Sequence, residues 1–125
     1  MKDSAESTAC PVLIVEDDED LRDMMAQMLT IEGFHATTVA NGREALDYLH
    51  TASPPHVILL DLMMPVMDGW EFRRRQQADR DLARVPVIVL SALDQARAAI
   101  IDATAFLKKP LDFDLLLALV RQHCR

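Results

Sequence analysis

Residues 57–61 read Val-Ile-Leu-Leu-Asp, four large apolar side chains that end at a single carboxylate. A run this short, with no polar residue on either face, is typical of a strand buried between two layers of helices. The stretches at 12–15 (Val-Leu-Ile-Val) and 85–90 (Val-Pro-Val-Ile-Val-Leu) have the same character, and a polar residue follows each. The pattern predicts a parallel sheet whose chemistry gathers at the carboxyl ends of its strands.

The rest of the chain alternates strand and helix patterns. Further strands are predicted at residues 34–39 and 106–108. Helices are predicted from Leu21 to a C′ glycine at Gly33, from a cap at Asn41 through Leu49 with Glu44 completing a capping box, and at residues 70–81, 94–101 and 112–123. The fold class is therefore α/β, a doubly wound sheet of five parallel strands with helices on both faces and right-handed crossovers.

Length and charge limit the function. The chain has 125 residues, the size of one domain, and a formal net charge of −7, which argues against direct nucleic-acid binding. We read residues 1–10 as a flexible N-terminal leader and 11–125 as the domain. No stretch has the ~20 apolar residues of a membrane span, and no signal peptide is recognisable, so we expect a cytoplasmic protein with no membrane contact.

The two cysteines, Cys10 and Cys124, lie near opposite ends of the chain and have no metal-ligand spacing. We interpret them as free thiols in a reducing compartment. The four histidines show no ligand spacing either, and the basic run at 73–75 is interpreted as a solvated helix flank.

Polar residues stand where the predicted strands end: Glu16 and Asp17 after the first, Asp61 after the third, Ser91 after the fourth and Lys109 after the fifth. Carboxylates brought together repel one another and stay ionised only if they share a cation. All-oxygen ligation with few protein ligands suits Mg²⁺. A carboxylate beside that ion can attack phosphorus, and an ammonium and a hydroxyl can stabilise the phosphoryl oxygens.

These residues lie in five ordered motifs or strand ends, among them Val-Glu-Asp-Asp (15–18), Leu-Leu-Asp-Leu-Met-Met-Pro-Val-Met-Asp-Gly (59–69), Val-Leu-Ser-Ala (89–92) and Phe-Leu-Lys-Lys-Pro (106–110). In them the chain resembles the receiver domain of bacterial response regulators, the CheY-like superfamily of two-component phosphorelay signalling. The resemblance covers residues 11–122. It implies a flavodoxin-like fold with strand order 2-1-3-4-5.

The resemblance also implies residue roles. Asp61 would be the phosphoacceptor, and Glu16, Asp17, Asp61 and the backbone carbonyl of Met63 would hold Mg²⁺, with Glu16 acting largely through water. Ser91 would be the switch hydroxyl and Lys109 the partner of the phosphoryl group.

Two further features come from the same resemblance. Phe106 would be the aromatic switch residue, and the Lys109–Pro110 peptide would be cis. The implied partners are a sensor histidine kinase or phosphotransfer protein and a downstream effector. The domain would be a switch and not an enzyme, either stand-alone or excised from a larger regulator or hybrid kinase.

The sequence departs from the family pattern between Ser91 and Phe106, which are only 15 positions apart, about one helical turn short. We therefore expect a shortened fourth helix at 94–101 and do not carry over a dimer through that face. Met63 and Leu93 are apolar and flank the expected path of the hydrolytic water, which favours a long-lived phosphoryl group.

The sequence fits three other functions less well. A haloacid-dehalogenase-type phosphatase would carry a second Asp where this chain has Met63. A flavodoxin-like cofactor binder would have a Ser-, Thr- or Gly-rich loop after the first strand, where this chain has Glu-Asp-Asp-Glu-Asp (16–20). A degenerate receiver that only scaffolds would not need the complete set of acids, hydroxyl and lysine.

Overall fold

The structure is a computed structural model that describes residues 9–93 and 102–124. Its elements, in chain order, are β1 (Pro11–Val15), α2 (Glu19–Ile31), β2 (His35–Val39), α3 (Gly42–Thr51), β3 (Val57–Asp61), α4 (Gly69–Ala78), β4 (Val87–Ser91), β5 (Ala105–Lys108) and α6 (Phe113–Gln122). The helix predicted at 94–101, and with it the shortened fourth helix, falls outside the described residues, as do residues 1–8 of the predicted leader. No helix within the described ranges is long and apolar enough to cross a membrane.

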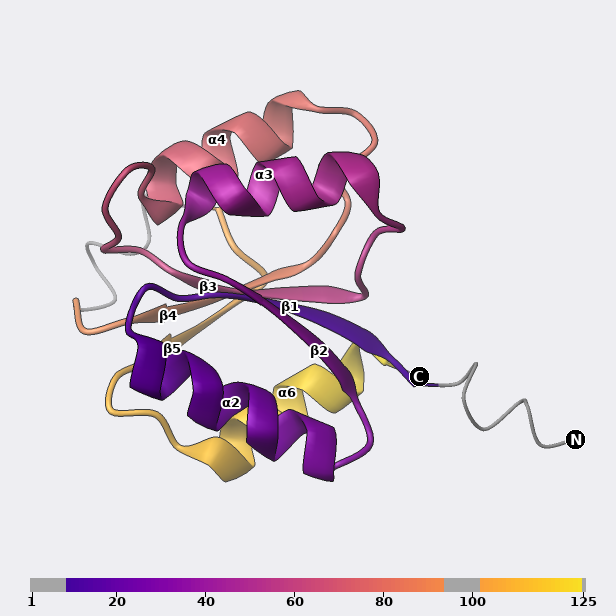
Figure 1. The fold of residues 1–125 in the computed structure, drawn as a ribbon, viewed down its shortest axis with the longest axis vertical. Helices are drawn as coiled ribbons and strands as arrows, with labels where there is room; N and C mark the ends of the chain where they lie inside the picture. The colour runs from indigo at the N-terminus through magenta and orange to yellow at the C-terminus, as the bar shows by residue number, and fades with distance from the viewer. Residues whose placement is uncertain (1–8, 94–101, 125) are drawn as a thin grey trace, which may run out of the picture.

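The five strands form one parallel sheet in the order β2-β1-β3-β4-β5. Figure 1 shows α3 and α4 covering one face of this sheet and α2 and α6 covering the other. The predicted doubly wound α/β fold and its strand order are confirmed.

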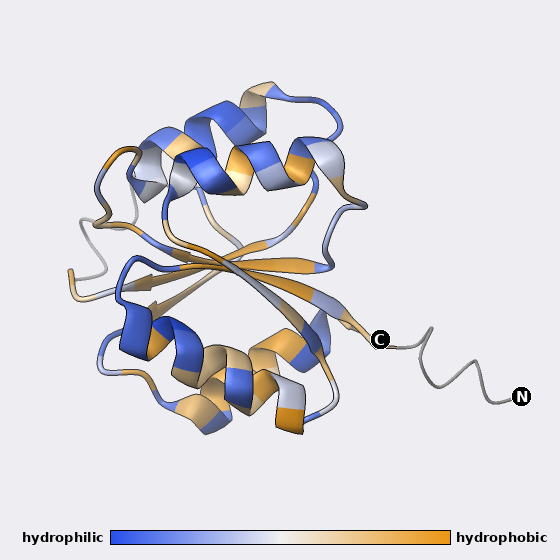
Figure 2. Ribbon diagram, viewed as in Figure 1, coloured by the Kyte–Doolittle hydropathy of each residue, from blue (hydrophilic) through white to orange (hydrophobic). Residues whose placement is uncertain are grey.

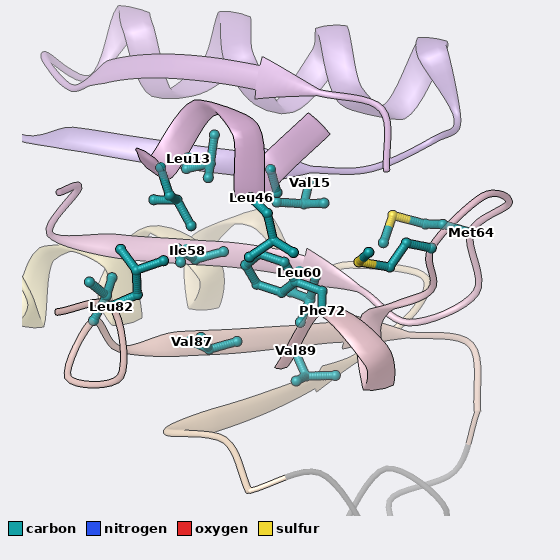
Figure 3. Close-up of a cluster of buried hydrophobic side chains, with 14 of the residues drawn as sticks. Leu13, Val15, Leu46, Ile58, Leu60, Met64, Phe72, Leu82, Val87 and Val89 are labelled. Atoms are coloured by element: carbon teal, nitrogen blue, oxygen red, sulfur yellow. The ribbon is translucent and has the colours of Figure 1, made fainter. Parts of the chain in front are cut away.

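Each face of the sheet carries its own hydrophobic cluster. In Figure 2 the strands form a largely apolar layer, α3 and α4 are mostly hydrophilic, and α2 and α6 mix hydrophilic with apolar residues. Under α3 and α4 the side chains of Leu13, Ile58, Leu60 and Val87 pack around Phe72, which is fully buried (Figure 3). Burial of each such side chain contributes about 1.5–3 kcal/mol, so the strands are held mainly by packing on both faces.

Side-chain and glycine caps close both ends of α2, and the glycine is the predicted Gly33. The side chain of Asp18 caps its start by accepting a hydrogen bond from the N–H of Leu21 at 3.2 Å. At the other end Gly33 has a φ of +93°, the left-handed conformation that glycine adopts without strain. The N–H of Phe34 then reaches back to the carbonyl of Leu29 at 3.0 Å, which completes a Schellman motif and turns the chain into β2.

The start of α3 is capped by Asn41, whose side chain accepts from the N–H of Glu44 at 2.9 Å. The carboxylate of Glu44 accepts in return from the N–H of Ala40 at 2.8 Å, one residue before the cap itself. The predicted reciprocal capping is therefore present in a slightly extended form.

Four element bounds differ from prediction by more than one residue: α2 begins at Glu19 and not at Leu21, α3 ends at Thr51 and not at Leu49, and the start of β4 and the end of α4 also differ. β4 begins at Val87 and not at 85, because Pro86 has no N–H to give to a sheet and contributes only its carbonyl, which accepts from Ile58 at 2.9 Å. α4 ends at Ala78 and not at 81, because Asp79 takes an extended conformation and serves as the C-terminal cap.

Arg73 contradicts the interpretation of 73–75 as a solvated flank, because its side chain is buried. Its Nε–H donates to the backbone carbonyl of Asp102 at 2.7 Å and its Nη1 donates to Oε1 of Gln76 at 2.8 Å. Burial lowers the pKa of Arg73, and the nearby carboxylate of Asp102 opposes this effect. Arg73 thus ties α4 to the segment that leads into β5.

The interpretation of the cysteines as free thiols is wrong. Cys10 and Cys124 form a disulfide, with their Cα atoms 5.7 Å apart. The pairing arises because α6 packs under β1, so that residues 114 positions apart in sequence lie side by side. Cys10, assigned to the leader, is only 6% exposed and belongs to the core. The inference of a reducing compartment from free thiols therefore has no basis.

Candidate functional site

The carboxyl ends of four strands meet at one edge of the sheet. Asp61 ends β3 and pairs in register with Leu90 on β4, while Ser91 ends β4. Glu16 follows β1 directly and Lys109 follows β5 directly. Because all the strands are parallel, the topology brings the predicted polar residues to the same edge.

Three carboxylates form the centre of this edge. Glu16, Asp17 and Asp61 each place an oxygen within 4.8 Å of the other two. Glu16 and Asp61 are 1% and 4% exposed, whereas Asp17 is exposed. The group therefore consists of two buried acids and one exposed acid, and we call it the acidic pocket.

Lys109 points into the acidic pocket. Its Nζ donates to Oε1 of Glu16 at 2.9 Å and to Oδ1 of Asp61 at 3.4 Å. Three carboxylates and one ammonium leave a formal charge of −2 (−3 and +1) when all are ionised. This charge and the all-oxygen donors fit a hard divalent cation such as Mg²⁺.

The electrostatics of the pocket follow from burial and crowding. Burial, with the negative charge of Glu16 as a second cause, raises the pKa of Asp61 to about 7, against the opposing effect of Lys109. For Lys109 itself burial lowers the pKa, but the carboxylates of Glu16 and Asp61 outweigh it and the net pKa is raised. Lys109 therefore stays charged, whereas burial and the charge of Glu16 oppose the ionisation of Asp61.

Both oxygens of Glu16 already have protein partners. While Oε1 accepts from Lys109, Oε2 accepts from the N–H of Asp18 at 3.1 Å. The backbone carbonyl of Glu16 also accepts from Arg22 at 3.1 Å. Glu16 is consequently fixed between the lysine and the start of α2, and Asp17 is the acid nearest to solvent.

The hydroxyl and the aromatic residue lie on the far strands of the site. Ser91 is buried, its Oγ accepts from the N–H of Leu93 at 3.0 Å, and its carbonyl accepts from the N–H of Lys109 at 2.8 Å. Phe106 is half-buried beside Val89 in the adjoining strand. The peptide between Lys109 and Pro110 is cis.

The loop after Asp61 is held close to the strand end by Gly69, a residue to which the sequence reasoning gave no role. A Cβ at Gly69 would lie 2.6 Å from the carbonyl oxygen of Asp61 and 2.8 Å from Cα of Leu62, so only glycine fits. The N–H of Gly69 donates to the carbonyl of Leu62 at 2.9 Å. Met63, in the same loop, is 60% exposed.

A second cluster lies at the start of β1, where Cys10, Cys124 and His56 place side-chain atoms within 4.8 Å of one another. His56 has no ligand spacing in the sequence, because the cluster exists only in the folded chain. The sulfurs are joined in a disulfide, so they are not thiolate ligands in this state.

Comparison with known proteins gives the class of this fold and site. A family model described as the response regulator receiver domain matches residues 12–121. The chain belongs to this family, the CheY-like receiver domains of two-component signalling.

Among its relatives is the alkaline phosphatase synthesis transcriptional regulatory protein SphR of Synechococcus elongatus, 36% identical over 97% of this chain and 51% of SphR. Response regulator MprA of Mycolicibacterium vanbaalenii is 36% identical over 91% of this chain and 50% of MprA. The chain thus spans about half the length of these curated relatives.

Solved structures agree. The receiver domain of a signal transduction histidine kinase from Syntrophus aciditrophicus is 32% identical with a TM-score of 0.84, covering 93% of this chain and 90% of that one. The receiver domain of sensor histidine kinase PA1611 from Pseudomonas aeruginosa PAO1, 28% identical with a TM-score of 0.83 over 93% of this chain and 98% of that one, has a magnesium ion coordinated in its active-site cleft.

Proposed function

We propose that this domain is a phosphorylation switch in which Asp61 accepts a phosphoryl group from a sensor histidine kinase or phosphotransfer protein, with Mg²⁺ in the acidic pocket. The observation that carries the proposal is the convergence of three carboxylate oxygens within 4.8 Å of one another, with the Lys109 ammonium donating to two of those carboxylates. The magnesium ion in the cleft of the PA1611 receiver domain supports the choice of metal.

The proposed metal site has direct ligands and one residue that acts through water. Asp17 and Asp61 would hold Mg²⁺ directly, together with the backbone carbonyl of Met63. Glu16 would act through water, in keeping with the engagement of both its oxygens by Lys109 and the N–H of Asp18. When bound, the metal supplies positive charge against the oxygens of the transferring phosphoryl group.

The chain's own groups perform the transfer by positioning and charge. A carboxylate oxygen of Asp61 attacks phosphorus, the P–N bond of the phosphohistidine donor breaks, and its electron pair leaves on the imidazole. Lys109, already charged and within the pocket, donates to a phosphoryl oxygen in place of a carboxylate. The Ser91 hydroxyl donates a hydrogen bond to a second phosphoryl oxygen.

Phosphorylation then biases the conformation of the domain. The phosphoryl group adds charge at the edge where β3, β4 and β5 end, and its contacts with Ser91 and Lys109 stabilise one of two pre-existing conformations. Inward movement of the half-buried Phe106 would accompany that change. We propose that the altered face then controls a downstream effector protein in the cytoplasm, with no direct nucleic-acid contact by this domain.

The test is labelling with acetyl phosphate in Mg²⁺, read by intact mass. Wild type should gain one phosphoryl group, and Asp61→Asn should gain none. Asp23→Asn, which removes an exposed carboxylate from α2, is the matched control and should label like wild type. Labelling of Asp61→Asn to the wild-type extent would overturn the assignment of the phosphoacceptor.

Metal binding is measured separately by calorimetric titration with Mg²⁺. Wild type should bind one ion, Asp17→Asn should bind at least about tenfold more weakly through loss of a direct charged ligand, and Asp23→Asn should be unchanged. Equal affinity of Asp17→Asn and wild type would place the metal elsewhere.

A further inference from the structure

The cluster of Cys10, His56 and Cys124 lies at the amino ends of the strands, away from the acidic pocket. Cys10 precedes β1, His56 precedes β3 and Cys124 follows α6. None of the three takes part in the proposed phosphoryl transfer. They nevertheless place the imidazole of His56 in contact with the disulfide between Cys10 and Cys124.

The geometry of the cluster is fixed by the backbone around it. The Nδ1 of His56 lies 3.1 Å from Sγ of Cys10. The N–H of His56 donates to the carbonyl of Pro11 at 2.9 Å, which anchors the histidine to β1. The Cα separation of 5.7 Å between the cysteines is usual for a disulfide, so the bond can form and break without movement of the strands.

The cluster is open to a reactant. His56 is exposed and Cys124 is partly exposed, whereas Cys10 is buried. A pocket of about 680 Å³ lies beside His56 and is also lined by Arg84 and by His123, the residue before Cys124. An incoming thiol would therefore reach Cys124 first and leave Cys10 beside the imidazole.

We propose that Cys10 and Cys124 form a reversible thiol–disulfide site in which His56 assists exchange with low-molecular-weight thiols such as glutathione. A glutathione thiolate attacks Sγ of Cys124, the S–S bond breaks, and its electron pair leaves on Cys10. The thiolate of Cys10 is stabilised by the N–H of the His56 imidazole. A second glutathione thiolate attacks the glutathione sulfur of the mixed disulfide, which releases Cys124 as a thiol and yields one glutathione disulfide.

Exchange would change the mechanics of the domain. The disulfide closes a loop of 114 positions and pins the end of α6 to the start of β1. Reduction releases that constraint, and the stabilisation from closing so long a loop is then lost. The acidic pocket lies at the opposite ends of the strands, so its residues keep their contacts.

The experiment follows the protein of residues 1–125 in EDTA, which keeps metals off the reduced thiols. Protein first equilibrated with oxidised glutathione is treated with reduced glutathione, quenched with N-ethylmaleimide and analysed by intact mass. Wild type should pass from no alkylated cysteine to two. His56→Gln should be reduced about tenfold more slowly, because the glutamine amide nitrogen replaces Nε2 and leaves no N–H at the position of Nδ1, the donor to the leaving thiolate. His50→Gln, also an exposed histidine, should match wild type.

Thermal melting supplies a second readout. Oxidised wild type should melt roughly 10 °C above both its reduced form and Cys124→Ser. Alkylation of both cysteines after treatment with oxidised glutathione would overturn the site itself. Equal reduction rates for His56→Gln and wild type would overturn the role of the histidine.

Discussion

Replacement of Asp61 by asparagine in the metal-free protein should stabilise the fold in a pH-dependent way. Burial and the charge of Glu16 raise the pKa of Asp61 from 3.8 to about 7. A carboxyl group with a higher pKa in the folded than in the unfolded state contributes stability below the unfolded value. That contribution is lost as the pH rises through the pKa of the folded state. The free energy of unfolding of wild type should therefore fall from about pH 4 to pH 7.

The size of the effect follows from the shift. About three pKa units correspond to ~4 kcal/mol at full value. The exposed Asp17 places an oxygen within 4.8 Å of Asp61, so solvent lies near the buried carboxylate and its screening reduces the penalty. We therefore expect about half of the full value, ~2 kcal/mol. Asparagine has the shape of aspartate without its charge and escapes this penalty.

The assay is urea denaturation in EDTA at pH 5 and pH 8. Asp61→Asn should exceed wild type in free energy of unfolding by ~2 kcal/mol at pH 8 and by less than ~1 kcal/mol at pH 5. The control Asp23→Asn should differ from wild type by less than ~0.5 kcal/mol at both pH values. An equal gain for Asp61→Asn at the two pH values, or a loss at pH 8, would refute the reasoning.

Three further outcomes are expected. Gly69→Ala should lower the free energy of unfolding by ~2 kcal/mol in urea, because its Cβ would meet the backbone of Asp61; an unchanged value would contradict the close approach. Arg73→Met should cost ~1–3 kcal/mol, because it leaves Oε1 of the buried Gln76 without its donor and removes the hydrogen bond to the carbonyl of Asp102. The exposed Arg74→Met should cost less than ~1 kcal/mol, and equal costs would show that the burial of Arg73 is energetically unimportant. Met63→Asn should shorten the phosphoryl lifetime, followed by phosphate release from purified phospho-protein in Mg²⁺; an unaltered lifetime would remove the role of an apolar residue at 63 in excluding water.

The sheet and the edge where its strands end could be predicted because both depend on local signals. Apolar runs such as 57–60 identify buried strands, and parallel pairing then brings the polar residue after each strand to one edge. Glu16, Asp61 and Lys109 meet for that reason. The strand order could not be predicted from these local signals and came from the resemblance to the family.

The features that escaped prediction depend on tertiary contacts. Cys10 and Cys124 are distant in sequence, and only the packing of α6 under β1 reveals their pairing. Arg73 stands in a run of arginines that is indistinguishable from a solvated flank until the carbonyl of Asp102 comes within reach. The close contact at Gly69 likewise requires the loop to fold back on β3.

A hydrogen bond and a close contact connect the turn into α3 with the loop after Asp61, so the two segments should move together at the carboxyl ends of the strands. The N–H of Gly42 donates to the carbonyl of Met67 at 3.0 Å, and a Cβ at Gly42 would lie 2.9 Å from Cγ of Met67. Gly69 packs the same loop closely against the end of β3. Displacement of residues 62–69 should therefore also displace the first turn of α3. Amide hydrogen exchange at these two segments should therefore speed up or slow down together.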